Sequence, residues 1–252
     1  MRTTYLLPIA LFVAVALAGC EQKAANTAVN SSNSGSDVSS SGDKPDNSNL
    51  TPSADTGSSG QDKEKAAERQ MTTDVTREPK EGEEVAVMET NHGRIVLMFF
   101  PEVAPKHVKS FKDLSAKGFY DGVQFHRAIP GFMIQGGDPN TKDESKRDQW
   151  GSGGPGYNLP AEFNEIKHER GILSAARSGH PDSAGSQFFI MHDKAPFLDG
   201  QYTVFGRVVS GLEAVDKIVE LKTDLSERTG GKILPENPAI IKSVKIEKWP
   251  VK

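Results

Sequence analysis

The sequence predicts a mainly β domain, in which a closed antiparallel barrel is covered at its ends by helices. Many short segments are rich in β-branched and aromatic residues, and turn residues separate them at regular intervals. Only two segments have the periodicity of an amphipathic helix. Together these segments occupy about 170 residues, which is a suitable size for one hydrophobic core.

The predicted strands begin with a hairpin. Glu84–Thr90 and Arg94–Phe100 are β-type runs, and Asn91-His92-Gly93 between them predicts a three-residue loop whose glycine can adopt a positive φ. A further strand and turn are expected within Gly122–Gln135, and Gly151–Pro160 is a glycine-rich loop that we expect to be flexible. The remaining predicted strands are Gly171–Ala176, Ser186–His192, Thr203–Val208 and Ile240–Trp249.

Two helices are predicted between these strands. Pro105 opens the first at a position that favours proline, and Gly118 is its expected C-terminal cap. Ser210-Gly211-Leu212-Glu213 has the pattern of a capping box and predicts the start of the second. The apolar faces of the two helices are formed by Val108, Phe111 and Leu114, and by Leu212, Val215, Ile218 and Val219.

The N-terminus, residues 1–19, is predicted to be a signal peptide. A basic start is followed by an apolar run, Leu6–Leu17, that is too short to cross a bilayer. Leu17-Ala18-Gly19-Cys20 resembles the lipobox of bacterial lipoproteins, which implies cleavage before Cys20 and its lipidation. The alternative is an ordinary secretory signal with a chance cysteine. The resemblance implies an extracytoplasmic protein anchored by lipid to the cell membrane, or to an outer membrane if one is present. Glu21, where an Asp would resemble an inner-membrane retention signal, favours the outer membrane.

Residues 20–81 are predicted to be a disordered linker rich in Ser, Asn and Gly. They contain almost no large apolar side chains, so burial cannot offset the entropy lost on ordering. A flexible chain of about 55 residues spans roughly 40 Å, which would hold a domain away from a membrane. The folded domain is therefore expected over 82–252.

The composition excludes several classes of function. The net charge of −4 argues against a nucleic-acid-binding protein. The single cysteine excludes internal disulfides and cysteine-rich zinc sites, and the six histidines lack the spacing of metal ligands. Gly151–Gly156 matches the dinucleotide pattern GxGxxG, but no helix is predicted after it. We therefore expect no metal and no cofactor, and we expect a monomer.

The segment Phe125–Asp138 contains the first candidate site. Alternation along a strand predicts that Phe125, Arg127 and Ile129 share one face. A guanidinium among bulky apolar side chains needs a partner, because burying an unpaired charge is costly. One interpretation is a structural salt bridge to Asp138 or another carboxylate. The other is an apolar cup, formed by Phe132 and Met133 behind a Pro-Gly turn, with Arg127 as a fixed donor.

A second candidate segment lies about 50 residues further along the chain. In Gly185–Ile190, alternation places Gln187 and Phe189 on one face and Phe188 with Ile190 on the other. We interpret Phe188 as a core residue. Phe189 shares its face with a polar side chain, which is more typical of the wall of a partly open pocket.

Taken together, these segments resemble the cyclophilins, the cyclosporin-binding peptidyl-prolyl isomerases. The motifs are Phe125–Asp138, Gly151–Tyr157 with Glu162-Phe163, Gly185–Ile190 and Phe197–Gly200, and the resemblance covers Val85 to Lys248. It implies an eight-stranded antiparallel barrel capped by two helices, with Arg127 as the catalytic residue and Gln135 orienting either Arg127 or the peptide carbonyl. It also implies a proline pocket lined by Phe132, Met133, Phe189 and Leu198. The adjoining groove, for the residues before the proline, is expected to be lined by Ala176, Arg177 and Gln187.

This chain departs from the best-known eukaryotic pattern at three positions in that site. Arg177 replaces Asn, Phe197 replaces Trp and Tyr202 replaces His. Arg177 could alter which residue is preferred before the proline. Without the Trp indole donor, we expect weak cyclosporin binding with catalysis intact, an expectation that nanomolar inhibition would contradict. The departures resemble those of bacterial cyclophilins.

Two functions from different classes follow from the resemblance. The first is a tethered isomerase that accelerates folding of exported proteins at X-Pro bonds by stabilising the twisted amide. The second is a chaperone that holds proline-containing segments, with turnover incidental. A donor directed at the proline nitrogen favours the first, since binding alone does not require it.

Overall fold

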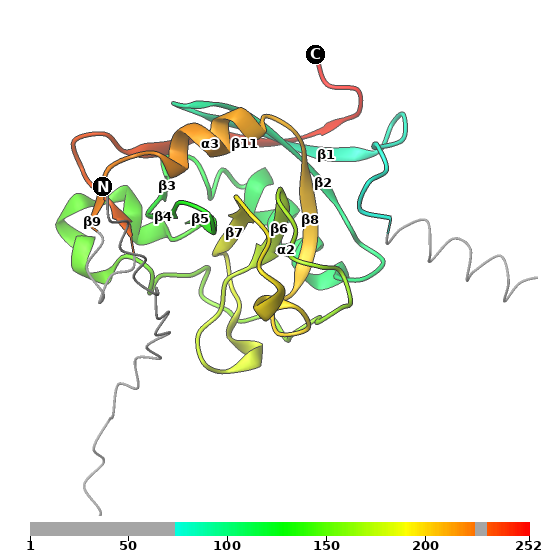
Figure 1. The fold of residues 1–252 in the computed structure, drawn as a ribbon, viewed down its shortest axis with the longest axis horizontal. Helices are drawn as coiled ribbons and strands as arrows, with labels where there is room; N and C mark the ends of the chain where they lie inside the picture. Colours follow the sequence, from blue (N-terminus) through cyan, green and yellow to red (C-terminus); the bar gives the residue numbers. More distant parts are fainter. Residues whose placement is uncertain (1–73, 225–230) are drawn as a thin grey trace, which may run out of the picture. The chain divides into compact units, whose positions relative to one another are not determined.

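The computed structural model describes residues 74–224 and 231–252. The predicted signal peptide, the lipidation site at Cys20 and most of the predicted linker lie outside the described residues. Within them, one antiparallel sheet curls into a half-barrel that is accompanied by two α-helices (Figure 1). The predicted fold class, mainly antiparallel β with two helices, is confirmed.

The sheet has eleven strands in the order β3-β11-β1-β2-β8-β6-β7-β5-β4-β10-β9. Three of them, β3, β9 and β10, have only two residues each, and the other eight are longer. The strands are β1 (Glu84–Thr90), β2 (Gly93–Phe99), β3 (Gln124–Phe125), β4 (Arg127–Ile129), β5 (Met133–Gly136), β6 (Ile172–Ala175), β7 (Phe188–Met191), β8 (Val204–Ser210), β9 (Thr223–Asp224), β10 (Lys232–Ile233) and β11 (Ala239–Lys248).

The two helices pack against the same core. Helix α2 (Pro105–Ala116) buries Val108, Phe111 and Leu114, as predicted, and Gly118 follows it with a φ of 64°. Helix α3 (Leu212–Val219) packs against β2, β4 and β5 (Figure 1). Its buried residues Val215, Ile218 and Val219 belong to that core.

The predicted capping box at the start of α3 is wrong. Ser210 is the last residue of β8, and the N-cap is Gly211, whose φ is 93° and which has no side-chain cap. A Cβ at Gly211 would lie 2.0 Å from the carbonyl oxygen of Arg94, so glycine is required by the close approach of two backbones. This packing constraint overrides the local capping pattern.

Aromatic side chains form the centre of the core. The Phe111 ring stacks on Tyr120 with a centroid distance of 4.9 Å and meets Phe188 edge-on at 5.6 Å. Phe188 also meets Phe125 edge-on at 5.9 Å. These pairs connect α2 to opposite walls of the curled sheet, so the interpretation of Phe188 as a core residue is confirmed.

The predicted shared face of Phe125, Arg127 and Ile129 is wrong for Phe125. Phe125 ends β3, which pairs with β11, whereas Arg127 begins β4, which pairs with β5. The alternation is interrupted at His126 between the two strands, so Phe125 and Ala128 both enter the main core. Arg127 and Ile129 remain together on the other face of the sheet.

Residues 74–83 precede the sheet and contact it. Arg77 forms a bidentate ion pair with Glu83, at 2.7 and 2.8 Å, and Val75 packs against apolar residues on the outer face of the sheet. The first eight of these ten residues fall within the segment predicted to be linker. Across the described ranges, no helix is long and apolar enough to cross a membrane.

Buried His126 makes the stability of the domain sensitive to acid. Burial lowers the pKa of His126 to about 4, although the nearby Asp138 partly opposes this effect, and no hydrogen-bond partner for its Nδ1 is found among the described residues. In the unfolded chain a histidine binds its proton near pH 6.5. The contribution of neutral His126 to the free energy of unfolding is therefore fully present above that pH and is lost as the pH falls towards 4. The full loss from this residue is about 3 kcal/mol.

We predict that His126→Gln reduces the slope of unfolding free energy against pH between 6.5 and 4. Urea titrations at several pH values would measure it. Part of the slope should remain, since burial also lowers the pKa of His107 and His168. An unchanged slope would contradict the prediction.

Candidate functional site

Two adjoining hollows lie on the outer face of the sheet around β4, β5 and β7. The smaller has a volume of about 110 Å³ and the larger about 790 Å³, and they share Gln135, Ala176 and Arg177 as a common wall. Nine of the eleven residues predicted for catalysis and substrate binding line the smaller hollow: Arg127, Phe132, Met133, Gln135, Ala176, Arg177, Phe189, Leu198 and Tyr202. We call it the small pocket and its neighbour the large groove.

Strand register brings the central residues of the small pocket together. Arg127 is paired with Gln135, and Gln135 with Phe189, so the three form one row across β4, β5 and β7. Met133 is two residues along β5 from Gln135 and therefore projects from the same face. Its side chain, with those of Phe189 and Leu198, is buried and forms an apolar floor.

Aromatic contacts fix the sides of the small pocket. Tyr202 meets the Phe189 ring edge-on at 5.7 Å, and His168 stacks on Phe189 at 5.9 Å. His168 is held by Asp199, which accepts from its Nδ1 at 3.1 Å, and it contacts Ser174 through Nε2. Burial lowers the pKa of His168, so the stacked ring is neutral near pH 7. Sequence reasoning missed His168 and Asp199, since neither occupies an alternating strand position beside the pocket.

Phe197 lies at the rim rather than in the pocket wall. Its side chain is 54% exposed, and its ring packs against that of Phe132 with a centroid distance of 5.6 Å. The two phenyl rings thus form an apolar ledge at the entrance. Phe132 belongs to the turn between β4 and β5, where Gly131 has a φ of 74° that glycine adopts without strain.

Arg127 provides a positive charge beside the apolar floor of the small pocket. Its guanidinium is partly buried, and its Nη1 donates to Oε1 of Gln135 at 3.5 Å. Burial lowers its pKa below the usual range, while the Tyr202 phenol opposes this effect. Arginine still remains cationic at neutral pH, because its ordinary pKa exceeds 12.

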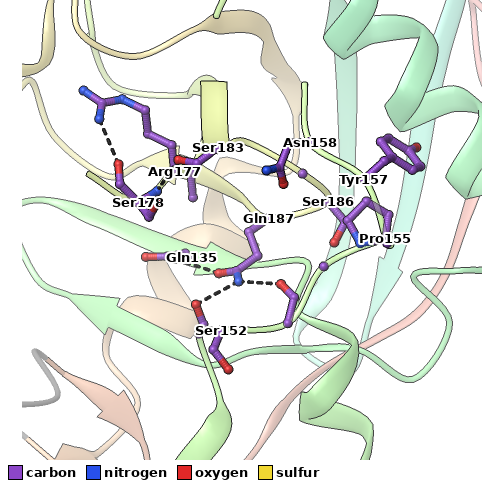
Figure 2. A pocket seen from close by; sticks show the side chains of 16 residues that line it. Gln135, Ser152, Pro155, Tyr157, Asn158, Arg177, Ser178, Ser183, Ser186 and Gln187 are labelled. Atoms are coloured by element: carbon purple, nitrogen blue, oxygen red, sulfur yellow. Dashed lines mark hydrogen bonds between the residues drawn. The ribbon is translucent and has the colours of Figure 1, made fainter. Parts of the chain in front are cut away.

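A chain of amide hydrogen bonds continues from Arg127 into the large groove. Nε2 of Gln135 donates to Oε1 of Gln187 at 3.0 Å. Nε2 of Gln187 donates to the carbonyl oxygens of Gly151 and Gly153, at 2.9 and 2.8 Å (Figure 2). The glycine-rich loop that we predicted to be flexible is therefore hydrogen-bonded to the predicted site.

The side chain of Asp138 holds this loop in place through hydrogen bonds. Its carboxylate is completely buried and accepts the backbone N–H groups of Asn140, Gly151 and Gly153. A Cβ at Gly153 would lie 2.1 Å from Oδ1 of Asp138, so the contact requires glycine there. The interpretation in which Asp138 forms a salt bridge with Arg127 is therefore wrong for this carboxylate, which accepts hydrogen bonds from the loop backbone.

The large groove runs between the loop Gly151–Asn158 and the segment that includes Arg177, Ser178 and Ser183–Gln187. Figure 2 shows Gln187 at its centre, with Arg177 on one side and Tyr157 on the other. The Tyr157 hydroxyl is tied to Ser110 of α2 at 2.8 Å. The groove is lined mainly by glycine and serine residues, which leave room for an extended polypeptide. No cluster of metal-ligating side chains occurs within residues 74–224 and 231–252.

Comparison with known proteins assigns the family. Residues 85–247 match the model of the family described as cyclophilin type peptidyl-prolyl cis-trans isomerase/CLD. The chain belongs to the cyclophilin family. It is a peptidyl-prolyl cis-trans isomerase, and its substrates are proline-containing peptides.

Individual cyclophilins align over much of the described domain. A probable peptidyl-prolyl cis-trans isomerase of Brucella abortus is 49% identical over 140 residues, which are 54% of this chain and 71% of that protein. Peptidyl-prolyl cis-trans isomerase B of Bacillus subtilis is 48% identical over 122 residues, 48% of this chain and 79% of that protein. A crystal structure of a Cryptosporidium parvum cyclophilin, in the presence of the dipeptide Ala-Pro, is similar with a TM-score of 0.56 and 34% identity. The match covers 65% of this chain and 99% of that one.

We predict that Asp138→Asn lowers kcat/KM on a prolyl peptide about tenfold, mainly through kcat. Loss of one loop anchor would loosen Gln187 and then Gln135, and one hydrogen bond to a charged group is worth enough for a factor of this size. Protease-free NMR exchange measurements would give both constants. Circular dichroism would confirm that the variant is folded at the assay temperature.

Asp143→Asn is a matched control for this experiment. Asp143 also caps a short 3-10 helix by accepting a backbone N–H, from Ser145, but it is exposed, and the partners of its carboxylate among the described residues are Ser145 and Lys146. Its variant should retain wild-type kcat and KM. Equal losses in the two variants would show that Asp138 has no special connection to the site.

Proposed function

We propose that this isomerase accelerates the folding of exported proteins by stabilising the twisted X-Pro amide with Arg127. Rotation about an X-Pro bond is slow because amide resonance imposes a barrier of about 18–20 kcal/mol. When the bond twists, resonance is lost and the proline nitrogen gains lone-pair character. A donor that reaches the nitrogen only then lowers the barrier, because it binds the transition state more tightly than either planar form.

The observation that carries this proposal is the position of a fixed cation above an apolar floor. The floor of Met133, Phe189 and Leu198 can receive the proline ring, and Arg127 lies in the same register row as Phe189. Gln135 holds the guanidinium through Oε1 and supports its orientation. The crystal structure of the Cryptosporidium parvum relative, determined with Ala-Pro, supports a prolyl ligand for a site of this family.

The second candidate is a chaperone that holds proline-containing segments. The exposed ledge of Phe132 and Phe197 and the adjoining large groove favour it, since both offer surface for an extended client. Neither feature accounts for a guanidinium held over the pocket. We therefore place isomerisation first and holding second.

We predict that Arg127→Ala lowers kcat/KM on a proline tetrapeptide by one to two orders of magnitude. A hydrogen bond to a charged group contributes about 1.5–3 kcal/mol, which corresponds to this range of rate. Arg94→Ala is the control, because Arg94 lies on β2 in an exposed ion pair with Glu89. Unchanged turnover in Arg127→Ala would contradict the assigned role.

The same variant separates the two candidate functions. Aggregation of a denatured proline-rich client should be slowed by the wild type and not by Arg127→Ala if turnover is the function. Full suppression by the inactive variant would favour the holding function.

We also propose that Cys20 is lipidated and anchors the enzyme outside the cytoplasm, at the cell membrane or at an outer membrane if one exists. The lipobox-like Leu17–Cys20 and the polar segment after it support this proposal. Two or more acyl chains would give a stable anchor, whereas one gives marginal binding. The chain should incorporate a fatty-acid probe and fractionate with membranes, and Cys20→Ala should abolish both. Labelling that persists in Cys20→Ala would contradict the proposal.

Weak cyclosporin binding remains an expectation of the same site. Phe197 lies at the entrance with an exposed phenyl ring and offers no indole N–H to a ligand.

A further inference from the structure

Arg177 introduces a positive charge at the junction of the two hollows. It lines both the small pocket and the large groove, and among the described residues it is the only charged one that lines the large groove. The charged residues of the small pocket are Arg127 and Arg177. Within residues 74–224 and 231–252, no acidic side chain lines either hollow, although the chain as a whole carries a net charge of −4.

The Arg177 guanidinium is held in place before any ligand binds. Its Nε donates to the carbonyl oxygen of Gln201 at 3.0 Å, and its Nη1 donates to that of Ser178 at 2.9 Å (Figure 2 shows the latter). The planar group also packs over the Tyr202 ring, 4.6 Å from its centroid, and near Phe163 at 5.7 Å. A donor fixed in this way loses little entropy when it binds a ligand.

One edge of the guanidinium remains available. The hydrogen bonds of Arg177 involve Nε and Nη1, and none of the ion pairs among the described residues includes it. The neighbouring acid Asp182 is engaged elsewhere, because its Oδ1 accepts the backbone N–H of Ala161 at 2.8 Å. Nη2 can therefore donate to a carboxylate supplied from outside the domain.

We propose that Arg177 selects substrates with an acidic side chain at one of the two positions before the proline. This inference rests on the proposed function, in which the proline ring occupies the small pocket. The chain before the proline then passes the shared wall of Gln135, Ala176 and Arg177 into the large groove. A Glu or Asp side chain at that point meets a cation, whereas a Lys side chain meets like charge.

The test uses two peptide series, Ala-Xaa-Pro-Phe and Xaa-Ala-Pro-Phe, in which Xaa is Glu, Gln or Lys. Glu and Gln have nearly the same shape, so their ratio isolates the charge. At low salt we expect Glu to exceed Gln about two- to fivefold in kcat/KM at one of the positions, the range expected for a partly exposed ion pair, with Lys below Gln. The difference should lie in KM and should shrink at high ionic strength.

Arg177→Gln should reduce the Glu-to-Gln ratio to about one, and Arg177→Lys should retain part of it. Arg94→Gln removes one positive charge on β2 and should leave the ratio unchanged, which separates a local contact from the general field of the protein. Equal rates for Glu and Gln in the wild type would overturn the proposal. A ratio that survives Arg177→Gln, or that falls equally in Arg94→Gln, would also overturn it.

The failure of this inference can be distinguished from failure of the proposed function. An enzyme that turns over all three peptides at equal rates loses only its acidic preference. If Arg127→Ala turns over every peptide as fast as the wild type does, the function proposed for the small pocket is wrong. The acidic preference proposed for Arg177 is then wrong as well, because it rests on that function.

Discussion

The arrangement of the site depends on the buried carboxylate of Asp138. A fully buried carboxylate is stable only when its oxygens accept hydrogen bonds, and here backbone N–H groups of the Gly151–Gly153 segment supply them. These bonds set the positions of the Gly151 and Gly153 carbonyl oxygens. Carbonyls can only accept, so Gln187 must turn its Nε2 towards them and its Oε1 away. Gln135 in turn presents Nε2 to Gln187 and Oε1 to Arg127.

This polarity explains why two glutamines lie between the loop and the guanidinium. A side-chain amide has a donor group and an acceptor group. Two amides in series can therefore donate to the loop carbonyls at one end and accept from the guanidinium at the other. The last acceptor faces a cation that can only donate. A carboxylate at the position of Gln135 would also accept from Arg127, but it could not donate to Gln187. The two amides therefore connect Arg127 to the loop through neutral groups.

The sequence was a good guide to the pocket and a poor guide to what supports it. Period-2 alternation placed Gln187 and Phe189 on one face, and resemblance joined them to Arg127, Phe132 and Met133. Alternation failed at Phe125, because a one-residue break at His126 changes the strand partner. The contact of Asp138 with Gly153 joins a side chain to a backbone amide 15 residues away. No periodicity encodes such a contact, so the loop looked like an ordinary connection.

The two arginines of the site have different roles because they lie at different positions. Arg127 lies over the apolar floor, where a donor can act on the nitrogen of a twisting amide, and its effect belongs to the transition state. Arg177 lies on the shared wall, where any carboxylate it binds is held equally in the planar and twisted forms. Uniform binding of that kind changes KM and leaves kcat alone. In the part of the chain that the structure describes, the cation of Arg177 is held by backbone carbonyls and aromatic faces rather than by a carboxylate, so its charge remains available to a substrate. A local contact of this sort can give the enzyme a preference among prolines without altering the step that it catalyses.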